Sequence, residues 1–225
     1  MFDCIIFDFD ETLVSFGRYI NWEKAYRRTI DLCLRRGVPK EILGKSKGNP
    51  LSFLSHMREE LFRILPKEEA SKILEEVTRI MDIEEFEALS KATVVPGCEE
   101  ILRWLRSHNV RVGVVSPHSE QITSYLLRKL KLKGFIRSIV GRSPNLRIKP
   151  HPEQVLLCLE RMECPKERTA LITVDEDGVR AAKTSGIHVI VVLSGSTHSI
   201  SNLLDARTDS IVEDFKALLS LLQQL

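Results

Sequence analysis

The stretch Cys4-Ile-Ile-Phe-Asp-Phe-Asp-Glu-Thr-Leu13 decides the fold of this chain. Its apolar part, Ile5 to Phe7, is rich in β-branched and aromatic residues and predicts a buried β-strand. The strand runs directly into Asp8 and Asp10, which lie two positions apart and so point to the same side of an extended backbone. A buried carboxylate needs a bound cation or a paired lysine. The stretch therefore predicts a charged site at the end of the first strand. A solvated turn after an edge strand is the simpler alternative, and the later segments argue against it.

Length and composition are those of an ordinary globular protein. The chain has 225 residues, of which 43% are hydrophobic and 28% charged, with a formal net charge of +2. This length supports one large domain, or a domain with a smaller insert. No apolar run approaches the roughly 18 residues of a membrane helix, and the mild charge does not favour nucleic acid. We therefore expect no membrane or nucleic-acid partner, and a monomer or homodimer.

The start of the chain and its cysteines favour a cytoplasmic protein. Met1 to Cys4 lacks the basic region of a signal peptide. The five cysteines, an odd number without a Cys-x-x-Cys motif, fit a reducing compartment better than a disulfide framework. Cys158 and Cys164 could approach each other, but we expect them to be buried apolar residues.

The hydrophobic pattern divides the chain into two parts. Between 15 and 94 it is helical throughout, with its clearest apolar stripe from Ala70 to Met81 and a further short helix near Ile83 to Leu89. Beyond it, strands and helices alternate, with strands expected at 110–115, 135–140, 169–174, 187–193 and 211–212. Alternation predicts an α/β fold with a doubly wound parallel sheet. Residues 1–14 and 95–225 would form this core, and 15–94 a helical cap inserted after the first strand.

Polar residues follow three of the expected strands. They are the pairs Asp8/Asp10, Ser116/His118 and Asp175/Asp177. In open parallel sheets, ligands bind outside the carboxyl ends of the strands. Three independent strands that end in polar pairs are a stronger indication of a site than any one motif.

The first of these pairs resembles the opening motif of the haloacid dehalogenase (HAD) superfamily, Asp-x-Asp-x-Thr. The match is Asp8, Asp10 and Thr12, and the resemblance extends over nearly the whole chain, toward the phosphoglycolate phosphatase and β-phosphoglucomutase branch. It implies a HAD-like Rossmannoid core with a helical cap. It also implies Asp8 as the nucleophile and Asp10 as the general acid and base. Dehalogenase members lack the second Asp, so Asp10 favours phosphoryl chemistry.

The resemblance supplies further catalytic and binding residues. Ser116 matches the second motif, which contacts a phosphoryl oxygen, although a helix N-cap is the simpler explanation of a lone Ser. Lys149, in Lys-Pro-His-Pro, matches the third motif, whose ammonium bridges nucleophile and phosphate. The other expected substrate-binding residues are Thr12, His118, Arg18 and Lys45. Mg²⁺, which prefers oxygen ligands, is the expected cofactor, held by Asp8, Asp10, Asp175 and Asp177.

The fourth motif departs from the family pattern, which is Gly-Asp-x-x-x-Asp. Counting back from Ala181-Ala182-Lys183 puts Thr173, Val174 and Gly178 where the Gly and the two Asp belong. Asp175 and Asp177 are displaced from those positions. Asp175 could still reach a metal, directly or through water, with Asp177 as the second choice. A loop that has lost its metal role is the alternative.

Two further departures affect the phosphate site. Pro117 follows Ser116 at a position where family members donate a backbone N–H, which proline lacks. His118 could compensate. Glu11 replaces the usual Gly and would add negative charge beside the metal. The sequence thus supports two hypotheses. The first is a Mg²⁺-dependent phosphatase acting on a small phosphorylated metabolite through an aspartyl-phosphate. The second is a binding or regulatory protein with weakened catalysis.

Overall fold

A six-stranded parallel sheet, in the order β5-β4-β1-β6-β7-β8, lies at the centre of the computed structural model, which describes residues 2–43, 50–193 and 200–224. The strands are β1 (Cys4–Asp8), β4 (Arg111–Ser119), β5 (Ser138–Arg142), β6 (Thr169–Thr173), β7 (His188–Val192) and β8 (Ser210–Val212). Asp8 pairs with Val115 of β4, and Phe7 with Ile172 of β6. The strand that carries the acidic stretch is therefore central.

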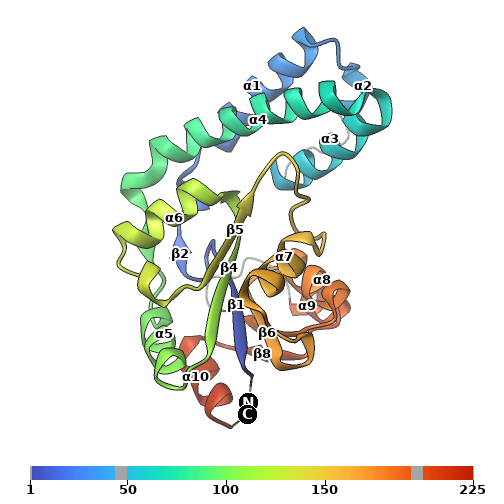
Figure 1. Ribbon diagram of the computed structural model, residues 1–225. Coiled ribbons are helices and arrows are strands. Elements are labelled where there is room, and N and C mark those ends of the chain that lie inside the picture. Colours follow the sequence, from blue (N-terminus) through green and yellow to red (C-terminus); the bar gives the residue numbers. More distant parts are fainter. Residues whose placement is uncertain (1, 44–49, 194–199, 225) are drawn as a thin grey trace.

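Helices cover both faces of this sheet (Figure 1). One face holds α5 (Cys98–Ser107), α6 (Glu120–Lys129) and α10 (Phe215–Gln224), and the other holds α7 (Glu153–Met162), α8 (Glu176–Ser185) and α9 (Ile200–Asp205). In β1, Ile5 and Phe7 pack with the first group, and Cys4 and Ile6 with the second. Burial on both faces explains the continuous apolar run. The predicted doubly wound α/β fold is confirmed.

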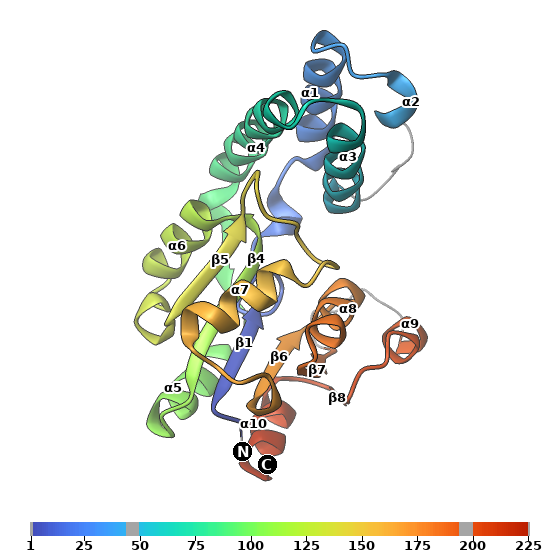
Figure 2. The same ribbon diagram turned by 45° about the vertical axis from the view of Figure 1, so that its right-hand side comes forward.

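A helical insertion separates β1 from β4. It consists of α1 (Trp22–Arg35), α2 (Lys40–Leu43), α3 (Pro50–Ile64) and α4 (Lys67–Ala88), with a hydrophobic cluster of its own. The short antiparallel strands β2 (Val14–Ser15) and β3 (Thr93–Val94) pair where the chain leaves the sheet and returns. Figures 1 and 2 show the insertion standing above one end of the sheet, with the long α4 descending beside α6. Short 3-10 turns lie at Gly17–Tyr19, Leu89–Lys91, Lys133–Phe135 and Lys166–Arg168.

The expected elements differ from the structure mainly at their ends. The separate helix expected near residues 83–89 is the last part of α4, whose face turns so that Ile83 and Phe86 are exposed while Glu84 and Glu85 are buried. The strand expected at 135–140 begins later, as β5, because a 3-10 turn precedes it. β4 extends to Ser119, past the expected end at residue 115. Among the described residues, no helix combines the length and apolarity that crossing a membrane requires.

The cysteines differ from the expectation. Cys4 at the start of β1 forms a disulfide with Cys164, which follows α7, and their Cα atoms lie 6.3 Å apart. Cys158 remains a free buried thiol, as do Cys33 and Cys98. The partners are 160 residues apart in the sequence, and only the packing of α7 across the sheet brings them together. Spacing alone could not identify this pair.

We expect the disulfide to contribute to stability, because it closes a very long loop in the unfolded chain. Replacing Cys164 by Ser should lower the free energy of unfolding by about 2–5 kcal/mol. Urea unfolding with and without a reducing agent measures the effect. The Cys164→Ser variant is the control, since reduction should destabilise the wild type and leave the variant unchanged. A wild type that is insensitive to reduction would contradict the prediction.

Candidate active site

An ion pair between Asp8 and Lys149 lies at the carboxyl end of β1. Asp8 is the last residue of that strand, and Lys149 lies in the loop that joins β5 to α7. The Nζ atom of Lys149 is 2.5 Å from Asp8 Oδ2, and both residues are almost fully buried. The backbone N–H of Phe9 donates to the other oxygen of Asp8 at 2.9 Å. Two residues predicted as catalytic, 141 positions apart, are thus in direct contact.

Asp175 is the second carboxylate beside Lys149. Its Oδ2 atom lies 3.2 Å from Lys149 Nζ, and its Oδ1 atom caps α8 by accepting from the Gly178 N–H at 2.6 Å. Side chains alternate along this segment, so Thr173 and Asp175 face the site while Val174 packs into the hydrophobic cluster on the other face of the sheet. The alternation explains why the displaced acid still reaches the site.

The Thr173 side chain occupies the space that a side chain at position 178 would need. Thr173 donates to Asp8 Oδ2 at 3.3 Å. A β-carbon on Gly178 would collide with the Thr173 hydroxyl and its β-carbon. A side chain at position 178 therefore has no room here, because Thr173 fills that space. Asp177 lies in the first turn of α8.

Burial and charge act together on this group. Burial raises the pKa of Asp8 to about 7, Lys149 opposes the rise, and Asp175 adds to it. Burial alone would lower the pKa of Lys149, but Asp175 and Asp8 raise it above its ordinary value. Lys149 is therefore a permanent ammonium in this site. One ammonium faces two carboxyl groups, and the raised pKa of Asp8 means that burial and Asp175 disfavour its ionised form in this site.

Asp10 lies beyond the strand end, beside the entry to the insertion. It accepts from the N–H groups of Phe16 at 3.1 Å and Gly17 at 2.7 Å. Burial raises the pKa of Asp10, and His118 and these N–H groups oppose the rise. A β-carbon on Gly17 would collide with the Asp10 carboxylate. Glycine is thus required for this approach.

Glu11 adopts a φ of +56°, in the left-handed region that favours glycine. Its carboxylate accepts from Ser15 Oγ at 3.1 Å and from Arg18 Nε at 3.0 Å. The expected extra negative charge is therefore paired with Arg18. No described contact joins Arg18 to Asp8 or Lys149, and its substrate-binding role stays a prediction.

Ser116 lies inside β4 and is fully buried. Its hydroxyl oxygen accepts from Thr123 Oγ1 at 2.8 Å and from the His118 N–H at 3.2 Å. Gln154 of α7, also buried, donates to the Ser116 carbonyl at 2.7 Å and accepts from the Lys149 N–H at 3.4 Å. Gln154, which the sequence did not single out, thus links the strand of Ser116 to Lys149. Among the described residues, the buried hydroxyl of Thr12 has no hydrogen-bond partner.

His118 belongs to a buried polar cluster, the α4–β4 cluster, with Glu85, Arg142 and Asp82. Glu85 Oε1 lies 3.0 Å from His118 Nδ1 and accepts from Arg142 Nη1 at 2.6 Å. Arg142 also donates to Asp82 Oδ1 at 2.6 Å and to the Pro117 carbonyl at 3.1 Å. The sequence carried a signal for this cluster. Glu85 follows Met81 at helical spacing, so a charged residue continues the apolar stripe.

The donor set suits an oxygen-liganded cation, although the site is not preassembled. Among residues 2–43, 50–193 and 200–224, no three His, Cys, Asp or Glu side chains gather as a metal site. Mg²⁺ needs only one or two carboxylates and completes its shell with water and substrate phosphate. Asp8 and Asp175 place two carboxyl groups beside Lys149, and both can supply oxygen ligands. We regard these two as compatible with Mg²⁺.

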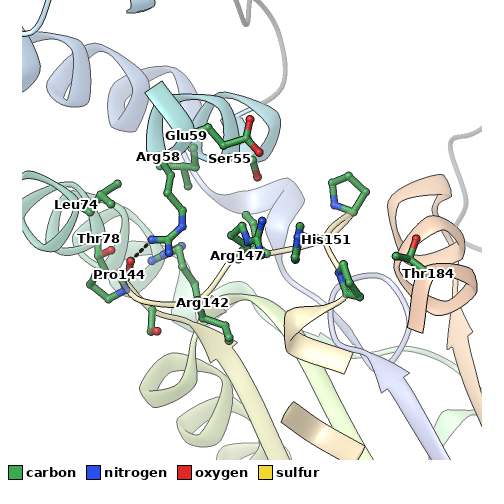
Figure 3. A pocket seen from close by; sticks show the side chains of 16 residues that line it. Ser55, Arg58, Glu59, Leu74, Thr78, Arg142, Pro144, Arg147, His151 and Thr184 are labelled. Carbon is green, nitrogen blue, oxygen red and sulfur yellow. Dashed lines mark hydrogen bonds between the residues drawn. The ribbon is translucent and has the colours of Figure 1, made fainter. Parts of the chain in front are cut away.

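A cavity of about 330 Å³ lies between the insertion and the β5–α7 loop (Figure 3). Ser55 and Arg58 of α3 line it on one side, and His151 of the loop on another, with Arg58 bonded to the Pro144 carbonyl. The residues on either side of Lys149 also line it. The cavity therefore borders the turn that carries the buried lysine. Lys45, predicted to read the substrate, lies outside the described residues.

Comparison with known families and proteins extends over most of the chain. The model of the haloacid dehalogenase-like hydrolase family matches residues 5–192. A phosphoglycolate phosphatase of Nitrosococcus oceani is 22% identical over 96% of this chain and 87% of its own length. A phosphorylated carbohydrates phosphatase of Thermotoga maritima is 26% identical over 94% of both chains. A phosphoglycolate phosphatase of Pseudomonas putida is 28% identical, but the match spans only 46% of that protein.

Solved structures share the fold at low sequence identity. A hydrolase from Pseudomonas syringae superimposes with a TM-score of 0.65 at 20% identity, over 99% of both chains. A haloacid dehalogenase-like family hydrolase from Streptococcus pneumoniae gives a TM-score of 0.62 at 17% identity, again over 99% of both. The fold resemblance therefore includes the helical insertion as well as the sheet.

The α4–β4 cluster predicts a specific pH dependence of stability. Burial alone would raise the pKa of Glu85, but Arg142 and His118 lower it to about 2, from an ordinary value of 4.5. A depressed pKa contributes stability that is present above the unfolded-state pKa and lost as the pH falls through the folded-state pKa. At pH 7 we expect Glu85→Gln to lower the free energy of unfolding by about 3 kcal/mol.

Urea unfolding of both proteins at several pH values tests this expectation. Charged groups facing Glu85 are Arg142, His118 and Asp82, all retained in the variant. The difference in unfolding free energy should be constant above about pH 5.5 and should narrow as the pH falls below about 4.5. A difference that does not change with pH would mean that the charge of Glu85 does not stabilise the fold.

Proposed function

The chain belongs to the haloacid dehalogenase-like hydrolase family, and from this premise we propose that it is a Mg²⁺-dependent phosphatase acting on a small phosphorylated metabolite. The observation that carries the proposal is the buried Lys149–Asp8 contact at the carboxyl end of the central strand. An anionic nucleophile that attacks an anionic phosphoryl group needs positive charge beside it. Lys149 supplies such a charge within 2.5 Å of the carboxylate.

The proposed reaction has two displacement steps. An oxygen of Asp8 attacks phosphorus and forms an aspartyl-phosphate, while the bond from phosphorus to the leaving oxygen breaks. Asp10 gives its proton to that oxygen. Water then attacks the phosphorus of the intermediate, Asp10 takes a proton from it, and the bond to Asp8 breaks to release phosphate. When bound by Asp8 and Asp175, Mg²⁺ would neutralise phosphoryl charge and hold the reacting groups in line.

Ser116, Thr12 and His118 are the proposed contacts to the phosphate. The orphaned Thr12 hydroxyl supports this role, because a buried polar atom without a partner is costly unless a ligand completes it. Asp10 and Asp177 complete the proposed metal group, with Asp10 contributing also to proton transfer. The N–H groups of Phe16 and Gly17 both donate to Asp10 Oδ1, so Oδ2 is the oxygen that we propose for proton transfer.

The relatives' names suggest the substrate class. They describe phosphatases of phosphoglycolate and of phosphorylated carbohydrates, and we propose a substrate of similar size. Its non-reacting half would lie under the insertion, residues 15–94, which we propose acts as a cap. The cavity beside the Lys149 turn, with Arg58 on its wall, suits an oxygen-rich group. Arg18 and Lys45 remain candidates for the same task.

We further propose that the protein acts in the cytoplasm as a monomer or homodimer, without a nucleic-acid or membrane partner. A cytoplasmic location requires the Cys4–Cys164 disulfide to persist in a reducing compartment. Disulfides do so in hyperthermophiles and are rare in other cytoplasmic proteins.

The second candidate is a protein that keeps the fold and binds phosphorylated ligands with little turnover. Val174 and Gly178 stand where the family has metal-binding acids, and Lys149 contacts both Asp8 and Asp175. These observations favour weak metal binding. The two candidates differ in turnover, which the following variants measure.

Asp8→Asn should abolish phosphate release, because an amide is a far weaker nucleophile than a carboxylate. Phosphate release from an aryl phosphate and from small phosphorylated acids and sugars measures it, with Mg²⁺ and with a chelator. Circular dichroism and thermal unfolding control for folding. Turnover by a folded Asp8→Asn protein at the wild-type rate would remove Asp8 as the nucleophile. A wild type that binds phosphate without turnover would favour the second candidate.

Asp175→Ala should raise the Mg²⁺ concentration that half-maximal activity requires, because it removes the carboxylate that lies with Asp8 beside Lys149. Asp177→Ala is the comparison variant, since that residue is the second candidate for the metal and lies two positions further along in α8. Mg²⁺ titration of activity, and calorimetric titration of the protein alone, measure the change. A larger effect of Asp177→Ala would assign the metal to that acid instead.

A further inference from the structure

The α4–β4 cluster joins the helical insertion to the strand that carries Ser116. Glu85 and Asp82 come from α4, His118 from β4 and Arg142 from the end of β5. Glu85 and His118 are fully buried, and Arg142 is 6% exposed. A buried ionic group is costly unless its partners are well placed. Solubility cannot explain charges that are buried, and the contacts of the cluster suggest a role for them in the site.

The contacts of the cluster converge on three consecutive residues, Ser116 to His118. Arg142 donates to the Pro117 carbonyl at 3.1 Å, and Glu85 lies 3.0 Å from His118 Nδ1. Pro117 has no N–H with which to hold its own backbone in place. The His118 N–H donates to the Ser116 hydroxyl at 3.2 Å. The orientation of the Ser116 hydroxyl thus depends on a segment that is fastened at its next two residues.

Glu85 is the hydrogen-bond acceptor that Arg142 and His118 share. One oxygen, Oε1, is bonded to both Arg142 Nη1 and His118 Nδ1. Because an ionised carboxylate only accepts hydrogen bonds, Nδ1 of His118 is the donor. Its Nε2 is buried and, among the residues that the structure describes, has no partner. Loss of the Glu85 charge would leave Arg142 with the Asp82 carboxylate and the Pro117 carbonyl, and would weaken the hold on the His118 imidazole.

Glu84, the preceding residue, provides a contrast. It is equally buried, but it pairs with Arg28 at 2.9 Å and Lys24 at 3.1 Å, both on α1. Its contacts therefore stay inside the insertion. Two adjacent buried glutamates on one helix thus serve different partners, one within the insertion and one in the sheet.

We propose that Glu85 is a positioning residue, which holds the segment Ser116–His118 for phosphate binding from the helical insertion through His118 and Arg142. This inference rests on the proposed function, because it assumes that the segment contacts the phosphate. According to this proposal, α4 helps to shape the phosphate site without contacting the substrate. The Glu85 side chain acts only through residues of the sheet.

The experiment compares Glu85→Gln with Glu84→Gln in the full chain. Steady-state kinetics with an aryl phosphate and inhibition by inorganic phosphate report on the site. Hydrogen exchange of the Ser116, His118 and Ser119 amides, followed by mass spectrometry, reports on the segment without requiring activity. Thermal unfolding establishes that each variant is folded at the assay temperature.

We expect Glu85→Gln to lower kcat/KM and to weaken phosphate inhibition by about 10- to 100-fold, as small displacements of positioned groups do. Exchange of the segment amides should accelerate in this variant. Glu84→Gln should stay within about twofold of the wild type on all three readouts, although it loses stability. Equal effects of the two variants, or an unchanged Glu85→Gln, would overturn the proposal.

A second variant covers the case in which Glu85→Gln does not fold. In Glu85→Met with Arg142→Met, apolar side chains replace both members of a buried ion pair, which often preserves stability. This protein should fold, and it should show the same loss of kcat/KM and the same faster exchange. A folded double variant with wild-type kinetics and exchange would overturn the proposal.

The activity and phosphate-binding readouts, set beside amide exchange, also separate this inference from the proposed function. A wild type that neither hydrolyses phosphate esters nor binds inorganic phosphate would refute the proposed function, and with it the phosphate role assigned to the segment. Slow exchange in the wild type that persists in Glu85→Gln would refute the positioning role alone. Lost activity together with faster exchange in Glu85→Gln supports both.

Discussion

The buried ion pair between Asp8 and Lys149 is the constraint to which the rest of the site conforms. Each charge would be costly alone in a site this enclosed, and each is stabilised by the other. The lysine must therefore reach the end of the central strand from the loop after β5, two strands away. Gln154 holds that loop to the Ser116 carbonyl. Strand order, loop course and side-chain packing all serve this one contact.

Hydrogen bonds that position the segments around Asp8 and Lys149 come from both the sheet domain and the helical insertion. α7 contributes Gln154 from the sheet side, and α4 contributes Glu85 from the insertion. The insertion is consequently joined to the sheet by side-chain contacts as well as by the two chain segments that connect them. It has its own hydrophobic cluster, yet its longest helix ends in a set of buried charges shared with β4 and β5. Apolar packing stabilises each part, and the polar contacts of the α4–β4 cluster fix the position of the insertion relative to the sheet.

Sequence reasoning recovered the features that depend on local pattern. The apolar run before Asp8 and the alternation beyond residue 95 were enough for the sheet and its polar edge. The resemblance brought Lys149 to Asp8, but no motif indicated the pair Cys4 and Cys164, because spacing carries no information about which helix crosses which strand. Glu85 was not predicted, although it continues the apolar stripe of α4 at helical spacing. That position indicates that the side chain is buried, but it does not identify the partner. Side-chain alternation explains why Asp175 reaches Lys149 despite its displaced position.

The close approach of Thr173 to Gly178 also determines which substitutions these two positions can accept. An acid introduced at position 178 would meet the Thr173 side chain, which fills the space it needs. A glycine introduced at position 173 would remove the hydroxyl that donates to Asp8. Each position therefore limits the side chains that the other accepts. An acid at position 178 requires a smaller residue at position 173 as well, so it needs a paired substitution rather than a single one.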